Sequence, residues 1–158
     1  MAATTADRTN ATTYTNDAIP FPVAASTTVY AYENVGINTS GGNSGYITPI
    51  SAIANLYWIG YALYQGNNSA GAAGAVYTPV VLLGNGPDNG LFLMDCTNAQ
   101  TTTWLGQIVY FTDDHTVGLS GANSVIAGMV VQILGGINTN GVITGASNVV
   151  VNSGRRAL

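Results

Sequence analysis

The chain has 158 residues, which is enough for one domain with a buried core. Charged residues make up only 6% of it, against about a quarter in ordinary soluble domains, and the formal net charge is -4. There is no lysine, and the arginines are Arg8, Arg155 and Arg156, so the chain lacks the basic surface that nucleic-acid binding requires. Its longest apolar runs also fall short of the roughly twenty residues that span a bilayer. We therefore expect neither a nucleic acid nor a membrane as partner.

The scarcity of charge has a second consequence, for solubility. Charge repulsion is a common means of keeping proteins apart, and a surface of Thr, Asn, Ser, Gly and Tyr provides little of it. The composition therefore favours a protein that is a component of a larger assembly and that binds to the surfaces of other proteins.

The N-terminal segment divides into two parts. Residues 1–18 have almost no apolar content and no periodicity, so alone they are expected to be disordered. Residues 19–23 alternate proline with large apolar side chains, which requires an extended backbone. Two interpretations follow: a flexible tail before an edge strand, or an arm that becomes ordered on a neighbouring subunit.

Short β-rich runs separated by turn-forming residues make up the rest of the chain, and no segment has a sustained helical period. Pro79 suggests that its run lies at a sheet edge. The pattern predicts an all-β fold, a small antiparallel β-barrel or sandwich with an extended N-terminal arm. The expected strands cover residues 27–37, 45–49, 56–64, 76–83, 91–94, 107–111, 125–134, 142–144 and 148–151.

Three segments have some of the features of binding sites. The aromatic run at residues 56–64 could form a sugar-stacking platform, although such runs also serve as core and subunit interface. The loop at residues 65–75 lacks the following helix and lysine of a phosphate-binding loop. The turn at residues 84–90 has Asp and Asn, but the only glutamate is Glu33, so a hairpin loop is favoured over a calcium loop.

The single cysteine, Cys96, excludes an intrachain disulfide. It could act as a nucleophile or metal ligand, but its sequence neighbours supply no partner for either role. A small buried thiol is the simpler interpretation.

Titratable groups are concentrated only at Asp113, Asp114 and His115. Paired carboxylates beside a histidine could bind a metal or act as a base. However, neighbours in an extended strand point to opposite faces, and aspartates in turns commonly bond to their own backbone. His115 is the sole histidine, and no nucleophile elbow is present. We therefore expect no enzyme, no cofactor and no metal.

One family resemblance covers roughly residues 20–151. The segment at residues 107–131 has a strand with Val-Tyr, a turn with two aspartates, Thr-Val, a Gly/Ser/Asn link and then Ala-Gly-Met-Val-Val. In this order the motifs resemble the capsid cement, or head decoration, proteins of tailed bacteriophages. Further matching segments lie at residues 22–25, 28–31, 45–49, 59–62, 67–75 and 148–151.

The resemblance implies an accessory protein on the outer surface of the virion head, made in the host cytoplasm. It would bind the major capsid protein and other copies of itself, as a homodimer or homotrimer. We accordingly expect a clasping arm at residues 1–23, a cement domain at 24–152 and a tail at 153–158.

The candidate contact residues are Ile19, Phe21 and Val23 as anchors in the arm, with Arg155 and Arg156 paired with acidic groups or simply solvated. Two alternatives remain. One is a receptor- or glycan-binding module that uses the tyrosine-rich strand. The other is a metal-dependent hydrolase centred on residues 113–115.

Overall fold

The protein is built almost entirely of β-strands, which confirms the predicted all-β class. The computed structural model describes residues 18–51, 53–83, 90–100, 102–120, 125–139 and 142–153. Within these ranges the only helical element is the short 3-10 helix η1 (Thr102–Trp104), and no helix is long and apolar enough to cross a membrane. The strands are β1 (Ala18–Pro22), β2 (Thr27–Val29), β3 (Asn34–Asn38), β4 (Ile47–Pro49), β5 (Leu56–Ala62), β6 (Gly66–Asn68), β7 (Tyr77–Leu82), β8 (Leu91–Gln100), β9 (Ile108–Phe111), β10 (Thr116–Gly118), β11 (Ile126–Leu134), β12 (Ile137–Thr139), β13 (Val142–Thr144) and β14 (Ala146–Asn152).

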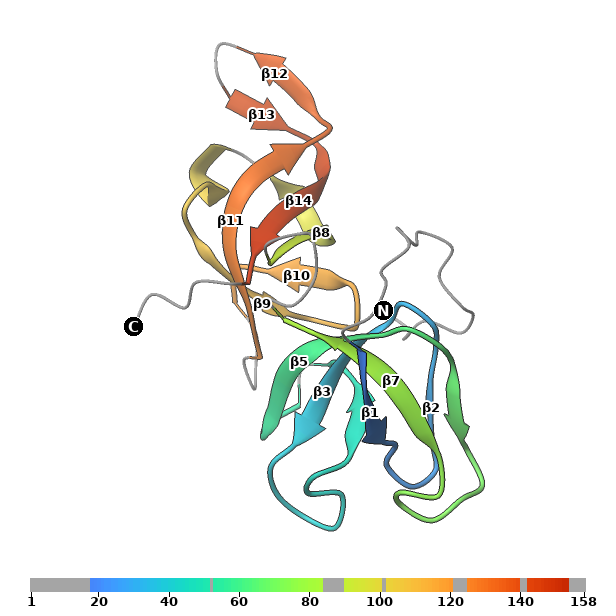
Figure 1. The fold of residues 1–158 in the computed structure, drawn as a ribbon. Coiled ribbons are helices and arrows are strands. Elements are labelled where there is room, and N and C mark those ends of the chain that lie inside the picture. The colour runs from blue at the N-terminus through green and yellow to red at the C-terminus, as the bar shows by residue number, and fades with distance from the viewer. Residues whose placement is uncertain are drawn as a thin grey trace.

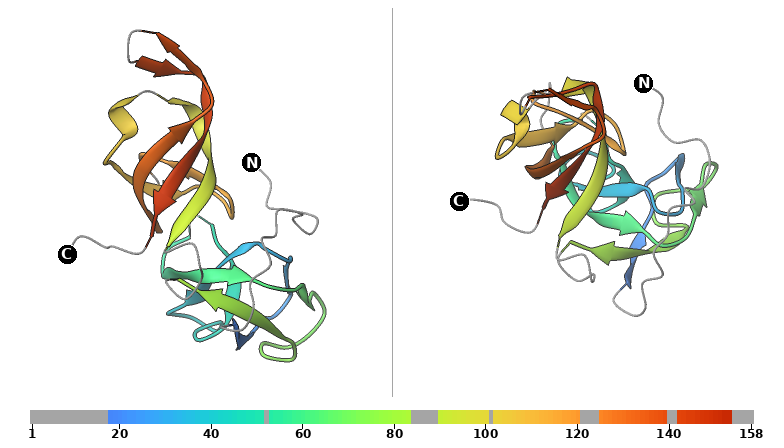
Figure 2. Two further views of the ribbon diagram at one scale, coloured as in Figure 1. Left: turned by 45° about the horizontal axis from the view of Figure 1, so that its top comes forward. Right: turned by 90° about the horizontal axis from the view of Figure 1, so that it is seen from above.

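The strands form two lobes (Figure 1). The first is an open five-stranded sheet, in the order β1-β7-β5-β3-β4, accompanied by the two-stranded ribbon β2-β6. The second is a closed barrel, in the order β10-β8-β14-β11-β9. A further ribbon, β12-β13, projects from the end of the barrel that lies away from the first lobe (Figure 2). The domain expected at residues 24–152 is thus an open sheet followed by a barrel.

The two central apolar runs, residues 107–111 and 125–134, pair with each other. Strands β9 and β11 pair antiparallel, with Ile126 opposite Tyr110 and Met129 opposite Ile108. Although β10 lies between these runs in the sequence, it pairs on the other side of β9 and not between the two runs in the barrel. From there β10 pairs in parallel with β8 and closes the barrel.

Part of the predicted arm belongs to the first sheet. Strand β1 pairs antiparallel with β7 and forms the outer strand of the sheet, a position that tolerates Pro20 and Pro22 because no further strand needs their missing N–H groups. Pro79 lies in β7, between β1 and β5, so the edge position expected for it is wrong. The β5-β7 ladder ends at the Ala62–Val80 pair, which explains how an inner strand accommodates Pro79.

Two groups of buried apolar side chains stabilise the lobes. The smaller one lies within the first lobe and consists of Val23, Val29, Val35, Ile47, Ala62 and Val80. The larger one fills the barrel, where paired residues such as Val130 and Val151 point inward. It also includes Ile50, Leu56 and Trp58 from the first lobe. The larger group is therefore a core that both lobes share.

Trp58 is the centre of this shared core. Its side chain comes from β5 and is only 4% exposed. The ring meets Phe92 of β8 and Phe111 of β9 edge to face, with both centroid distances at 4.9 Å. Its indole N–H donates to the backbone oxygen of Gly60 at 2.9 Å, so the one polar atom of the ring is satisfied.

Removal of the Trp58 ring should weaken the packing between the two lobes. We expect Trp58→Ala to lower the free energy of unfolding by about 3–5 kcal/mol, because a large cavity opens between the sheet and the barrel. Tyr57→Ala is the matched control, since this neighbouring ring is 54% exposed, and its effect should stay below about 1 kcal/mol. Urea denaturation followed by tryptophan fluorescence and circular dichroism measures both. Equal losses in the two variants would contradict this role of Trp58.

Candidate functional site

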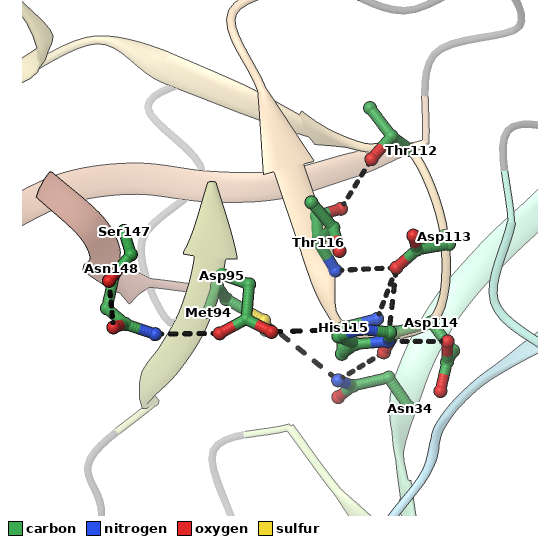
Figure 3. A network of polar contacts seen from close by, with 10 residues as sticks. All are labelled: Asn34, Met94, Asp95, Thr112, Asp113, Asp114, His115, Thr116, Ser147 and Asn148. Carbon is green, nitrogen blue, oxygen red and sulfur yellow. Dashed lines mark hydrogen bonds and ion pairs between the residues drawn. The ribbon is translucent and has the colours of Figure 1, made fainter. Parts of the chain in front are cut away.

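The residues Thr112–His115 connect β9 to β10 and form what we call the acidic turn (Figure 3). Both the backbone N–H and the hydroxyl of Thr112 donate to the carbonyl of Thr116, at 2.9 and 3.1 Å. Asp113 Oδ1 accepts from the backbone N–H groups of His115 at 3.1 Å and Thr116 at 2.8 Å. The expectation that an aspartate here bonds to its own backbone is confirmed.

The three titratable side chains of the acidic turn converge. His115 Nδ1 lies 2.8 Å from Asp114 Oδ1 and 3.2 Å from Asp113 Oδ1. One ligand atom from each residue lies within 4.8 Å of the other two. The argument that neighbouring residues point to opposite faces is therefore wrong here, because these residues form a turn and not an extended strand.

Residues from three other strands surround the acidic turn, as Figure 3 shows. Asn34 Nδ2 of β3 donates to the backbone oxygen of Asp114 at 2.8 Å, which connects the first lobe to the turn. Asp95 Oδ2 of β8 lies 3.7 Å from His115 Nε2. Asn148 Nδ2 of β14 donates to Asp95 Oδ1 at 2.7 Å. Sequence reasoning missed these three residues, because they are far from the turn along the chain and belong to no motif.

The electrostatics of the acidic turn are unusual. The Asp113 and Asp114 residues are 6% and 0% exposed. All three arginines lie outside the described residues and the chain has no lysine, so His115 is the only side chain of the described part that can carry a positive charge. Buried carboxylates require hydrogen bonds and a compensating charge. Because two buried carboxylates and an imidazole place ligand atoms close together, the turn is the candidate metal centre of the described part of the chain.

A second candidate site is an apolar band on the outside of the barrel. Leu91, Asn152, Met129 and Ile108 are successive partners across β8, β14, β11 and β9, so their side chains form one outward row. Leu91, Met129 and Ile108 are 42%, 37% and 39% exposed. Further exposed apolar side chains on these strands complete the band, which we define as Leu91, Leu93, Ile108, Ile126, Met129 and Val131.

The predicted anchors of the arm have different environments. Ile19 is exposed and Phe21 is half-buried against the core of the first lobe. Val23 is fully buried in that core, so its expected role as an anchor on another chain is corrected: the side chain already packs within its own lobe. Arg155 and Arg156 lie outside the described residues, as does most of the turn predicted at residues 84–90.

The aromatic strand β5 borders a shallow cleft of about 350 Å³ between the two lobes. Tyr57 lines it with an exposed ring, beside Thr39, Asn55 and Ile126. Trp58, in contrast, has its ring buried and its N–H bonded. Within this cleft, the aromatic surface available to a sugar would therefore be the ring of Tyr57.

Comparison with known proteins adds no relative: no protein-family model matches the chain, and no similar curated protein or solved structure was found.

Asp113 offers a direct test of the turn. Asp113→Ala removes the acceptor of two backbone N–H groups, whereas Asp113→Asn keeps an oxygen in the same place. We expect the alanine variant to be less stable than the asparagine variant by about 1–3 kcal/mol, the cost of a buried donor without a partner. Urea denaturation of both variants in the presence of a chelator measures the difference. Identical midpoints would show that the side-chain bonds contribute nothing to stability.

Cys96, in β8, should be an unreactive thiol. Burial and then the neighbouring charge of Asp95 raise its pKa from 9.0 to about 11. At pH 8 we expect it to react with a chromogenic disulfide about a hundredfold more slowly than in the unfolded chain, because only the thiolate attacks. The raised pKa also contributes stability that is fully present below pH 9.0 and is lost as the pH rises through about 11. A reaction rate that levels off near pH 9 would contradict this.

Proposed function

We propose that the protein is a capsid cement protein, which binds the outer surface of the major capsid shell of a tailed phage and bridges neighbouring capsomers. The observation that carries the proposal is the apolar band, on a chain with 6% charged residues. Large exposed apolar patches rimmed by polar residues are typical of protein interaction sites. The order of motifs along residues 20–151, which resembles cement proteins, supports the same function.

The work of such a protein is binding and not catalysis. Contacts that exist only in the assembled, expanded shell stabilise that shell by linkage. Repetition of the contacts over the lattice raises the total affinity through avidity, even where each contact is modest. A nearly uncharged contact surface depends on shape and apolar burial, so its affinity should change little with salt.

The band has side chains from β8, β9 and β11, with β14 lying between β8 and β11, so it extends around the barrel and faces more than one direction. One flat partner covers only part of it. We propose that the shell covers one part and a second copy of the chain another, in a homodimer or homotrimer. The exposed Ile19 next to residues 1–17, and Arg155 and Arg156, remain proposed additional contacts to the shell.

A glycan-binding module is the second candidate function. It is favoured by one specific observation, the cleft between the lobes with the exposed ring of Tyr57 and the polar side chains of Thr39 and Asn55. Aromatic rings with nearby hydrogen-bonding groups are suited to bind sugars. A glycan array with the isolated protein tests this alternative.

The cement function predicts stoichiometric decoration. Purified protein mixed with undecorated expanded heads should sediment with them and saturate at a fixed ratio to the major capsid protein. Leu93→Asp and Met129→Asp, which place a carboxylate in the band, should each weaken binding tenfold or more, because the charge must be desolvated in the contact.

Tyr77→Asp is the matched control, since Tyr77 is 61% exposed and lies on β7 of the other lobe. It should decorate like the wild type. Full occupancy by the two band variants would show that the shell does not contact the band. If the wild type did not sediment with the heads, the cement function would be overturned and the glycan-binding alternative would be favoured.

A further inference from the structure

We propose that the acidic turn binds one divalent transition-metal cation of the zinc type, with Asp113, Asp114 and His115 as its ligands. This site is independent of the proposed capsid function. It assigns a role to the one place in the described chain where buried carboxylates and an imidazole meet.

The first argument is a buried oxygen that has no partner. Asp113 Oδ1 receives two backbone hydrogen bonds, but Asp113 Oδ2 is buried and no hydrogen-bond partner reaches it. The Asp113 side chain is only 8% exposed, so water does not solvate this oxygen freely. A buried acceptor that lacks a partner costs about 1–3 kcal/mol, and more when it is charged. A cation beside the carboxylate would satisfy it.

The second argument is charge. Asp113 and Asp114 place two carboxylates in one buried turn. A protonated His115 would supply one positive charge, but its Nδ1 lies against the Oδ1 atoms of the two aspartates and leaves Asp113 Oδ2 unpartnered. A divalent ion beside Asp113 Oδ2 would partner the oxygen that the imidazole does not reach.

The third argument is geometry. Ligand atoms on a tetrahedral zinc ion, at bond lengths of about 2.0–2.2 Å, lie roughly 3.4 Å apart. The distances from His115 Nδ1 to Asp114 Oδ1 and Asp113 Oδ1, 2.8 and 3.2 Å, are somewhat shorter than that spacing, so the side chains need to move apart only slightly to admit an ion. Mixed imidazole and carboxylate ligands favour zinc or manganese over calcium and magnesium, which prefer oxygen alone.

The surroundings of His115 add an outer shell of the kind that metal-binding histidines have. The ring nitrogen that does not bind the metal usually faces a carboxylate, which orients the ring. Here Nε2 faces Asp95 Oδ2 at 3.7 Å, and Asn148 in turn holds Asp95 with a hydrogen bond of 2.7 Å. Asn34 fixes the backbone of the turn from the first lobe. The ligands are thus held in place by three different strands.

The test is a calorimetric titration of the untagged full chain, freed of metal with a chelator, with Zn²⁺, Mn²⁺, Mg²⁺ or Ca²⁺. We expect one Zn²⁺ or Mn²⁺ per chain and far weaker binding of Mg²⁺ and Ca²⁺. Asp113→Asn, Asp114→Asn and His115→Gln should each weaken Zn²⁺ binding at least tenfold. Asp95→Asn, in the outer shell, should weaken it about tenfold. Asp88→Asn, a carboxylate remote in the sequence, is the control and should leave the affinity unchanged.

Two results would overturn the proposal. One is the absence of saturable one-to-one binding to the wild type. The other is binding that depends on His115 but not on Asp113 or Asp114, which would indicate adventitious attachment to the sole histidine. Because a variant could fail to fold, the wild type is also titrated with Co²⁺, whose visible spectrum should show a low-coordinate site with nitrogen and oxygen ligands. All of these readouts use the isolated chain, so they are independent of shell decoration.

Discussion

The fold depends on the contact of Trp58 with Phe92 and Phe111. Neither lobe closes its own core at this place: the first lobe supplies the tryptophan from β5, and the barrel supplies the two phenylalanines from β8 and β9. Edge-to-face pairs contribute about 0.5–1.5 kcal/mol each beyond the area that they bury. The contact therefore fixes both the position of the lobes and the spacing of β8 and β9. These strands carry Asp95 and lead into the acidic turn, so the geometry of the turn depends on the same contact.

Local chemistry was largely predictable from the sequence. The all-β class follows from short β-rich runs between turn residues, and the backbone bonds of Asp113 follow from its place in a turn. Non-local pairing was not predictable. The barrel is closed by the parallel β8-β10 pair and by β14, which returns beside β8 from far along the chain. Such pairings depend on the topology of the whole chain, which the alternation of residues in one strand does not encode.

Single polar side chains account for other differences. The expected strand at residues 27–37 is divided into β2 and β3 by a turn in which Glu33 Oε2 accepts from the Tyr30 N–H at 2.7 Å. The loop expected at residues 65–75 contains β6, and the buried Asn68 there donates to the carbonyls of Ala24 and Ala72, at 2.9 and 2.8 Å. The strand expected at residues 91–94 in fact continues to Gln100 as β8. Turn-forming composition cannot distinguish a loop from a strand whose polar residues are satisfied by such bonds.

These examples share one constraint, the near absence of basic side chains. Glu33 and Asn68 are buried, and backbone groups serve as hydrogen-bond partners of both. The acidic turn also uses backbone N–H groups, which reach Asp113 Oδ1 but not the buried Asp113 Oδ2. On the outside, the same composition leaves the apolar band without the charged residues that usually limit association. The two proposed partners, a protein surface for the band and a cation for the turn, would each compensate for this composition at one place.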